Sequence, residues 1–314
     1  MKQRTIGNTG IKVSALGLGC NNFGLRIDED ASRAVIHKAL DLGITFWDTA
    51  DVYGKRGGSE TCLGKYLGPR RKDIFLASKF GSPMDDSGAQ RGASRKYIMS
   101  AVEASLKRLQ TDWIDLYQLH HYDPKTPLEE TMRALDDLVK QGKVRYLGFS
   151  TLVGWPFVDM QWTARQLGTT PLTCCESEYS ILKRGAERDL IPAMLKHGAQ
   201  LLPYYPLAGG FLTGKYKRNE ALPAGARITK GERYQGMFIS DTNWTILEML
   251  EAFCAARKHT LLELAFAWLL AQPVIATVIA GATKPEQLDA NIRAIEWELT
   301  PEEVAEVNEI SKKD

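Results

Sequence analysis

The stretch FWDTADVYGKRGGSE, residues 46–60, joins a short apolar run to a loop that is rich in glycine and charge. It places Asp48 and Tyr53 five residues apart, where the apolar run ends. Similar runs recur along the chain and are apolar on both faces, which is typical of strands in a parallel sheet covered by helices. The expected strands are residues 13–19, 45–49, 73–79, 114–120, 144–150, 172–177, 199–205 and 274–280.

Helical periodicity fills the segments between these strands. Residues 95–109 and 128–141 each carry apolar side chains at helical spacing on one face. Two Thr-Pro dipeptides, at 126–127 and 300–301, are each followed by a glutamate that completes the pattern of a capping box. Eight strand–helix units in about 280 residues favour an α/β fold of the (β/α)8 TIM barrel type.

We expect a single domain over residues 1–314, with long βα loops at the C-terminal rim of the barrel. The stretch 216–236 is rich in glycine, lysine and arginine and is expected to be one of these loops. A doubly wound sheet of the Rossmann type is the alternative. Its phosphate-binding fingerprint is incomplete, because Gly17 and Gly19 are not followed by a third glycine at the required spacing.

Composition excludes several classes of protein. The net charge is +2 and no long basic run occurs, so neither a nucleic-acid partner nor a membrane-adhering patch is expected. The N-terminus lacks the apolar segment of a secretory signal, and Gln272-Pro273 divides the most apolar stretch, 261–282, into pieces too short to cross a membrane. The five cysteines are odd in number and lack metal-ligand spacing. These features predict a reduced, cytoplasmic protein without a metal site.

Four polar residues fall at or just after expected strand ends. Asp48 ends the second strand, Lys79 the third and His120 the fourth, and Tyr53 follows the second. Each has an ordinary structural explanation, but in a barrel all four would meet at the C-terminal rim, where barrel enzymes carry out their chemistry. An ammonium lowers the pKa of a neighbouring phenol, and a carboxylate holds that ammonium in place. Lys79 and Asp48 are therefore expected to make Tyr53 a general acid.

The chain resembles the aldo-keto reductase family over essentially its full length. Besides the four polar residues it carries, in the family's order, DTADVYGKRGGSE (48–60), DLYQLHHYD (115–123), YYPLAGGFLTGKY (204–216) and GATKPEQLDANI (281–292). The resemblance implies a (β/α)8 barrel that binds NADP(H) in extended form without a Rossmann domain. It also implies an EC 1.1.1-type reduction of aldehydes or ketones, in which hydride comes from the nicotinamide, Tyr53 delivers the proton and His120 helps to orient the carbonyl.

The same resemblance implies which residues bind the cofactor. Gly19, Asn21 and Asp48 border the nicotinamide, and Tyr204 stacks on its face. The loop over the pyrophosphate corresponds to Pro206, Leu207, Gly210, Leu212 and Lys215, and a further phosphate or adenine contact comes from Arg227. The segment for the 2′-phosphate and the adenine, which favours NADP over NAD, corresponds to Gly281, Thr283, Lys284, Gln287 and Asn291.

Two positions depart from the family at the nicotinamide carboxamide. Ser150-Thr151 stands where the family usually has Ser-Asn, and Glu176 stands where it has a glutamine. An ionised Glu176 accepts a hydrogen bond from the carboxamide nitrogen but donates none to its oxygen. We expect the orientation of the cofactor to be kept and its affinity to change.

Two other functions stay open at this point. One is an NADP-binding regulatory subunit with little turnover, as in the potassium-channel β subunits of this fold. The other is a Schiff-base lyase that uses Lys79 as its nucleophile. The carbonyl substrate is expected to meet a partly aromatic pocket formed by Phe23, Phe80, Tyr122 and Tyr205, and both a monomer and a homo-oligomer are compatible with the sequence.

Overall fold

A barrel of parallel strands forms the centre of the computed structural model, which describes residues 1–150, 153–223, 226–230 and 232–313, without the side chains of residues 227, 230 and 232–234. The strand order is β10-β3-β4-β5-β6-β7-β8-β9, and an isolated parallel bridge between Leu201 and Ile275 joins the two edges. The strands are β3 (Leu16–Gly19), β4 (Phe46–Asp48), β5 (Phe75–Phe80), β6 (Ile114–Leu119), β7 (Val144–Ser150), β8 (Leu172–Glu178), β9 (Gln200–Tyr204) and β10 (Val278–Gly281).

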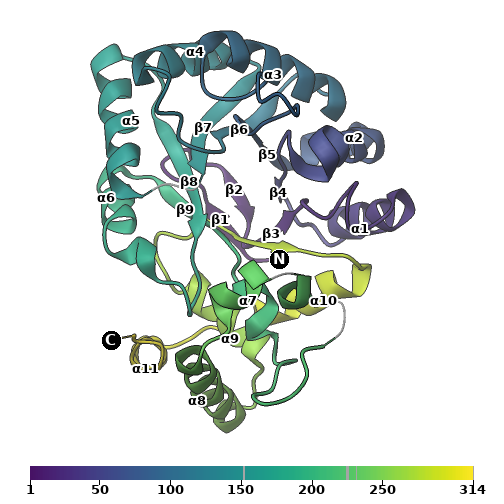
Figure 1. Cartoon of the computed structure of the whole chain (residues 1–314), viewed down its shortest axis with the longest axis vertical. Helices are drawn as coiled ribbons and strands as arrows, with labels where there is room; N and C mark the ends of the chain where they lie inside the picture. The colour runs from purple at the N-terminus through teal and green to yellow at the C-terminus, as the bar shows by residue number, and fades with distance from the viewer. Residues whose placement is uncertain (151–152, 224–225, 231, 314) are drawn as a thin grey trace.

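Helices cover the outside of this barrel, as Figure 1 shows for α1 to α6. Their bounds are α1 (Glu29–Asp41), α2 (Tyr53–Leu67), α3 (Arg95–Leu109), α4 (Leu128–Lys140), α5 (Gly154–Leu167), α6 (Leu190–His197), α7 (Glu232–Phe238), α8 (Asp241–Arg257), α9 (Leu261–Leu270), α10 (Pro285–Ala294) and α11 (Pro301–Ile310). None of the described helices is long and apolar enough to cross a membrane. The sequence-based prediction of a (β/α)8 barrel is confirmed, with the C-terminal strand ends at one rim.

The first predicted strand, 13–19, proves to be two elements. Residues Lys12–Ser14 form β2, which pairs antiparallel with β1 (Gln3–Thr5), and the barrel strand β3 begins only at Leu16. Val13 joins the first residues of β4 and β5 in the apolar cluster inside the barrel. The guanidinium of Arg4 donates hydrogen bonds to the carbonyl oxygens of Leu270 and Ile275, at 2.9 and 3.0 Å. The hairpin therefore closes the end of the barrel that lies opposite the C-terminal ends of the strands.

The two predicted capping boxes have different outcomes. Thr300 accepts from the backbone N–H of Glu303, whose carboxylate accepts from the N–H of Thr300 at 3.0 Å, so the start of α11 is confirmed. The box at Thr126 is wrong, because the hydroxyl of that residue donates to the carboxylate of Asp123 instead, at 2.8 Å. The hydroxyl of Thr126 is therefore used in a hydrogen bond within the loop before α4 and does not cap the helix.

Candidate active site

Strand alternation places Asp48 and Lys79 inside the barrel. Phe46 on β4 and Ala77 on β5 belong to the interior apolar cluster, and side chains two residues further along a strand point to the same face. The ammonium of Lys79, which is wholly buried, donates to both carboxylate oxygens of Asp48, at 2.6 and 2.7 Å, and to the carbonyl oxygen of Thr49 at 3.1 Å. A buried ion pair with complete hydrogen bonding thus forms at the C-terminal rim.

Tyr53 reaches this pair from the first turn after β4. Lys79 Nζ donates to Tyr53 Oη at 3.3 Å and lies 4.9 Å from the centre of the Tyr53 ring. The next four residues turn left-handed, with φ of 70° at Gly54 and 60° at Lys55. A Cβ on Gly54 would lie 2.4 Å from the backbone nitrogen of Ser59, so only glycine fits there. This strained turn lets the chain bring the phenol back to Lys79 before α2 continues.

The protonation of Tyr53 differs from the sequence-based expectation. Burial raises the pKa of the Tyr53 phenol, and the charge of Lys79 lowers it only in part, because Asp48 and Glu176 add to the effect of burial. The predicted lowering of the pKa is therefore wrong for this arrangement. The phenol keeps its proton near neutral pH, which is the form that a proton donor requires.

His120 lies beside the phenol, just past the end of β6. Its ring packs edge-on against the Tyr53 ring at 5.7 Å, and its Nδ1 is within 3.2 Å of the Ser82 hydroxyl. Burial, together with the charge of Lys79, lowers the pKa of His120 to about 2. The imidazole is neutral across the physiological range and acts as a hydrogen-bonding group rather than as a cation.

A second carboxylate, Glu176 on β8, also contacts Lys79. Its Oε2 lies 3.1 Å from Lys79 Nζ and accepts from the Gln118 amide at 3.3 Å. Burial and the charge of Glu176 raise the pKa of Asp48 well above its usual value, despite the opposing effect of Lys79. Sequence reasoning placed Glu176 at the carboxamide but missed its contact with Lys79. We call Asp48, Tyr53, Lys79 and Glu176 the lysine cluster.

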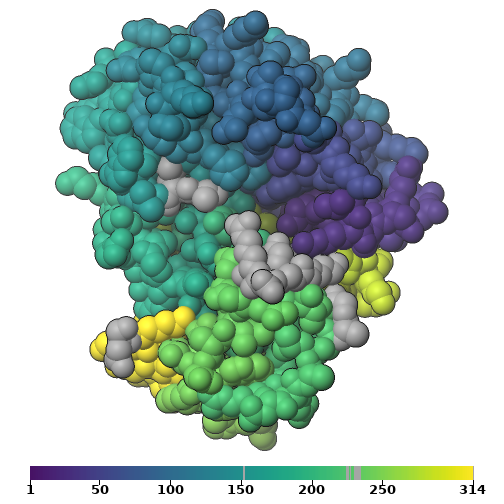
Figure 2. All heavy atoms as spheres, viewed as in Figure 1, coloured from purple at the N-terminus to yellow at the C-terminus, as the bar shows by residue number. Residues whose placement is uncertain are grey.

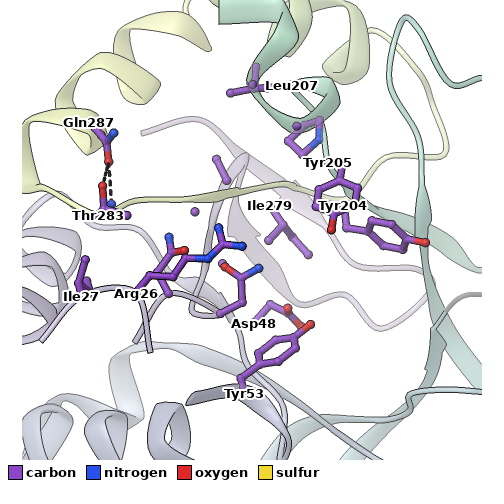
Figure 3. A pocket seen from close by; sticks show the side chains of 18 of the residues that line it. Arg26, Ile27, Asp48, Tyr53, Tyr204, Tyr205, Leu207, Ile279, Thr283 and Gln287 are labelled. Atoms are coloured by element: carbon purple, nitrogen blue, oxygen red, sulfur yellow. Dashed lines mark hydrogen bonds between the residues drawn. The ribbon is translucent and has the colours of Figure 1, made fainter. Parts of the chain in front are cut away.

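A cavity of about 510 Å³ extends from the lysine cluster to α10, a volume typical of small-molecule sites. Figure 3 shows Asp48 and Tyr53 at one end, Thr283 and Gln287 at the other, and Arg26 between them. Of the residues expected to bind cofactor, those that line it are Gly19, Asn21, Asp48, Glu176, Tyr204, Pro206, Leu207, Gly210, Lys215, Gly281, Thr283, Lys284 and Gln287.

Three of the other expected residues are absent from the described lining of the cavity. Leu212 and Asn291 are buried, and Leu212 belongs to the main apolar core beneath the loop that follows β9. Ser150 is buried at the end of β7 and is absent from the described lining. Thr151 and the side chain of Arg227 lie outside the described residues.

The aldo/keto reductase family model matches residues 15–312. The chain belongs to the aldo-keto reductase family. The uncharacterized oxidoreductase YrpG of Bacillus subtilis (strain 168) is 37% identical, over 99% of this chain and 96% of the relative. Aldo-keto reductase yakc [NADP(+)] of Schizosaccharomyces pombe is 35% identical, over 98% and 90%. L-glyceraldehyde 3-phosphate reductase of Escherichia coli (strain K12) is 31% identical, over 94% and 88%.

The cavity of this aldo-keto reductase is lined by cations and by a polar atom without a partner among the described residues. Asn22 is buried, and its amide donates to the carbonyl oxygen of Ala282 at 3.1 Å, whereas its Oδ1 has no partner among the described residues. Arg26 lines the same wall and makes no ion pair with any described residue. Lys215 and Lys284 line the cavity from other segments. Cations and unsatisfied polar groups around one cavity favour a polar, anionic ligand.

Sequence reasoning missed Asn22 and Arg26, although both follow the glycines that end β3. The signal was present as a basic residue in the first βα loop, where barrel enzymes commonly bind ligands. Figure 2 shows that the purple segment containing this loop and the green segment that follows β9 border the same face of the molecule. The cavity is lined by this loop, by the segment that follows β9 and by residues 279–287 near the end of the chain.

The start of α10 carries its own cap. Gln287 Oε1 accepts from the backbone N–H groups of Thr283 and Lys284, at 2.7 and 3.2 Å, and from the Thr283 hydroxyl at 3.2 Å. The sequence indicated a 2′-phosphate site at this helix start. An anion at this position must displace the side-chain oxygen of Gln287, which occupies the same donors.

The expected aromatic pocket is only partly formed. Phe80 follows Lys79 on β5 and so points to the opposite face, where it stacks on Tyr117 at 4.7 Å and is fully buried. Phe23 is also fully buried in the main core. Tyr205 does line the cavity, and Tyr122 packs edge-on against the exposed Trp155 at 5.6 Å. The prediction is therefore wrong for the two phenylalanines.

Proposed function

We propose that this protein is an NADPH-dependent reductase of aldehydes or ketones, of EC 1.1.1 type. The observation that carries the proposal is the buried contact between Tyr53 Oη and Lys79 Nζ at the end of a cavity whose far end is lined by Thr283 and Lys284. The names of two relatives, a reductase and an NADP(+) aldo-keto reductase, agree with this activity.

The residues of the lysine cluster have separate roles in the proposed mechanism. Tyr53 donates the proton from Oη to the carbonyl oxygen, and Lys79 stabilises the phenolate that remains. Asp48 holds Lys79 in place through its two hydrogen bonds. His120, which is neutral, orients the carbonyl by a hydrogen bond. NADPH, when bound, supplies the hydride.

The rest of the cavity is suited to hold the dinucleotide. Tyr204 packs edge-on against Tyr205 at 5.3 Å and lies at the nicotinamide end, where its ring is the stacking surface. Arg26 and Lys215 are placed to neutralise the pyrophosphate, and Thr283 and Lys284 to bind the 2′-phosphate. Gln287 then acts as a cap that yields to the phosphate.

A Schiff-base role for Lys79 fits the structure less well. Burial by itself would lower the pKa of Lys79, but Asp48 and Glu176 raise it well above the usual value. The side chain is therefore a firmly held ammonium, whereas a nucleophilic lysine must lose its proton. Borohydride added with a carbonyl compound should leave Lys79 unmodified.

Replacement of the proton donor tests the proposal. Tyr53→Phe should lower kcat by about 10² to 10⁴, since general acid catalysis contributes that much, while NADPH binding changes little. Tyr66→Phe is the matched control, because it removes a phenol from the other end of α2, where the hydroxyl contacts Glu29. Turnover of Tyr53→Phe within a fewfold of wild type would refute the role of Tyr53. Tight NADPH binding by wild type without turnover of any carbonyl would favour the regulatory subunit instead.

A further inference from the structure

Lys79 has more acceptors around it than an ammonium has protons. Three N–H bonds face the two oxygens of Asp48, the carbonyl of Thr49, the phenol of Tyr53 and the carboxylate of Glu176. The two carboxylates come from β4 and β8, which are not neighbours in the sheet. Both are almost completely buried, at 3% exposure.

The charges of this group do not balance when both carboxylates are ionised. Asp48 and Glu176 then carry two negative charges against the single positive charge of Lys79. Other titratable and polar groups near the cluster are Tyr53 on α2, Cys20 just after β3, His120 just after β6 and Gln118 on β6. Asp51, before α2, also interacts with the charge of Lys79. Burial keeps the first three neutral, since it raises the pKa of the phenol and the thiol and lowers that of the imidazole.

An uncompensated buried charge is costly, and two adjacent carboxylates commonly avoid it by binding one proton between them. The high pKa of Asp48, which burial and Glu176 cause, is consistent with such a pair. The proton belongs to the pair rather than to either residue. When the two carboxylates hold one proton between them, Lys79, Asp48 and Glu176 together carry no net charge.

We propose that Asp48 and Glu176 share one proton and release it to solvent when the oxidised dinucleotide binds, so that Glu176 makes the site sensitive to the oxidation state of its cofactor. The inference rests on the proposed function, because it requires the nicotinamide at the Glu176 end of the cavity. Only an O–H bond breaks, and no electrons move. The cluster changes from neutral to a charge of −1, which the positive ring of NADP⁺ balances and the neutral ring of NADPH does not.

The glutamate is what makes this coupling possible. A glutamine, which the family usually has at this position, carries no proton to release. Glu176→Gln is therefore a conservative variant that keeps the size of the side chain and one oxygen that can accept from Lys79, and it removes the charge and the titratable proton. Glu309→Gln is the control, since it makes the same change at an exposed side chain on α11.

The experiment is a set of dissociation constants for NADP⁺ and NADPH between pH 5.5 and 9, measured by protein fluorescence at fixed ionic strength. The ratio of the two constants cancels the titration of the 2′-phosphate, which both cofactors share. In wild type, the dissociation constant of NADP⁺ divided by that of NADPH should fall by up to about tenfold per unit rise in pH while the pair titrates. The reason is that one proton is released when NADP⁺ binds. Calorimetry in two buffers of different ionisation enthalpy should show that release directly.

Each outcome separates the possibilities. Glu176→Gln should give a ratio that is independent of pH and no proton release, while Glu309→Gln should behave as wild type. A flat ratio in wild type overturns the inference without any variant, and so does a Glu176→Gln protein that keeps the slope. If neither dinucleotide binds to wild type, the proposed function fails and the inference with it. If both bind with a flat ratio, the proposed function stands and the proton coupling is refuted.

Discussion

The lysine cluster and the start of α10 hold charge in opposite ways. In the cluster, Lys79 is fully enclosed and all its described partners are groups of the protein itself. At α10, Lys284 is exposed, and the helix amides are capped by the neutral side chain of Gln287. Removing one member of the first group leaves a buried charge without a partner, whereas the second group is prepared to exchange its cap for a ligand. The first region should therefore control folding and chemistry, and the second should control ligand choice.

The largest effect is expected in the lysine cluster. Lys79→Met leaves Asp48 and Glu176 buried without their cation, so it should lower the free energy of unfolding by about 3–5 kcal/mol at pH 7. Urea denaturation measures this change. Arg33→Met, which breaks an exposed ion pair with Asp30, is the control and should fall within the error of the measurement. A Lys79→Met protein as stable as the control would mean that the carboxylates already lack charge.

The next largest effect is expected at the start of α10. Lys284→Ala should weaken NADPH binding by about ten- to a hundredfold and leave NADH binding unchanged, because a charged hydrogen bond contributes about 1.5–3 kcal/mol. Gln287→Glu should act in the same direction, since it sets a carboxylate on the amides that the 2′-phosphate needs. Fluorescence titration at fixed ionic strength measures both. Lys312→Ala, at an exposed lysine away from the cavity, is the control. Equal losses for NADH and NADPH would show that the phosphate site lies elsewhere.

Asp51 is a second enclosed carboxylate: it is 1% exposed, and no described side chain donates a hydrogen bond to it. Burial, and then the charge of Glu60, raises the pKa of Asp51 to about 8. A raised carboxyl pKa means stability that is complete below about pH 4 and is lost as pH rises towards 8. Asp51→Asn should therefore gain about 1.4 kcal/mol of stability per pH unit relative to wild type in that window.

Urea midpoints at pH 5, 6, 7 and 8 check the behaviour of Asp51. Asp30→Asn, at an exposed carboxylate, is the control and should show no such trend. A constant difference between Asp51→Asn and wild type would mean that Asp51 is ionised throughout, with a partner that compensates its charge.

The smallest expected effect concerns His120. Because burial lowers the pKa of His120 to about 2, its ring should stay neutral from pH 5 to 8. The NMR signal of its ring carbon proton, assigned by its loss in His120→Gln, should keep a constant chemical shift over that range. A titration near pH 6.5 would show that solvent reaches the imidazole and that the enclosed region is more open than described.

The sequence by itself determined the barrel and the place of Asp48 and Lys79 at the C-terminal ends of its strands. Alternating apolar runs and helical periodicity are local signals, and side chains alternate along a strand with a period of two. The same rule applied to β5 puts Phe80 outside when Lys79 is inside, so that error was avoidable from the sequence. The N-terminal hairpin was missed because β2 and β3 form one continuous apolar run.

Only the tertiary structure decided which inward side chains meet. Glu176 reaches Lys79 because closure of the barrel brings β8 across the interior from β4 and β5, and no spacing along the chain reports that distance. The protonation of Tyr53 followed from the same closure, since burial outweighs the nearby ammonium. Gln287 caps α10 through a turn whose hydrogen bonds depend on exact backbone geometry. Local periodicity thus gave the elements and their faces, and the balance of charge depended on contacts between strands that are distant in sequence.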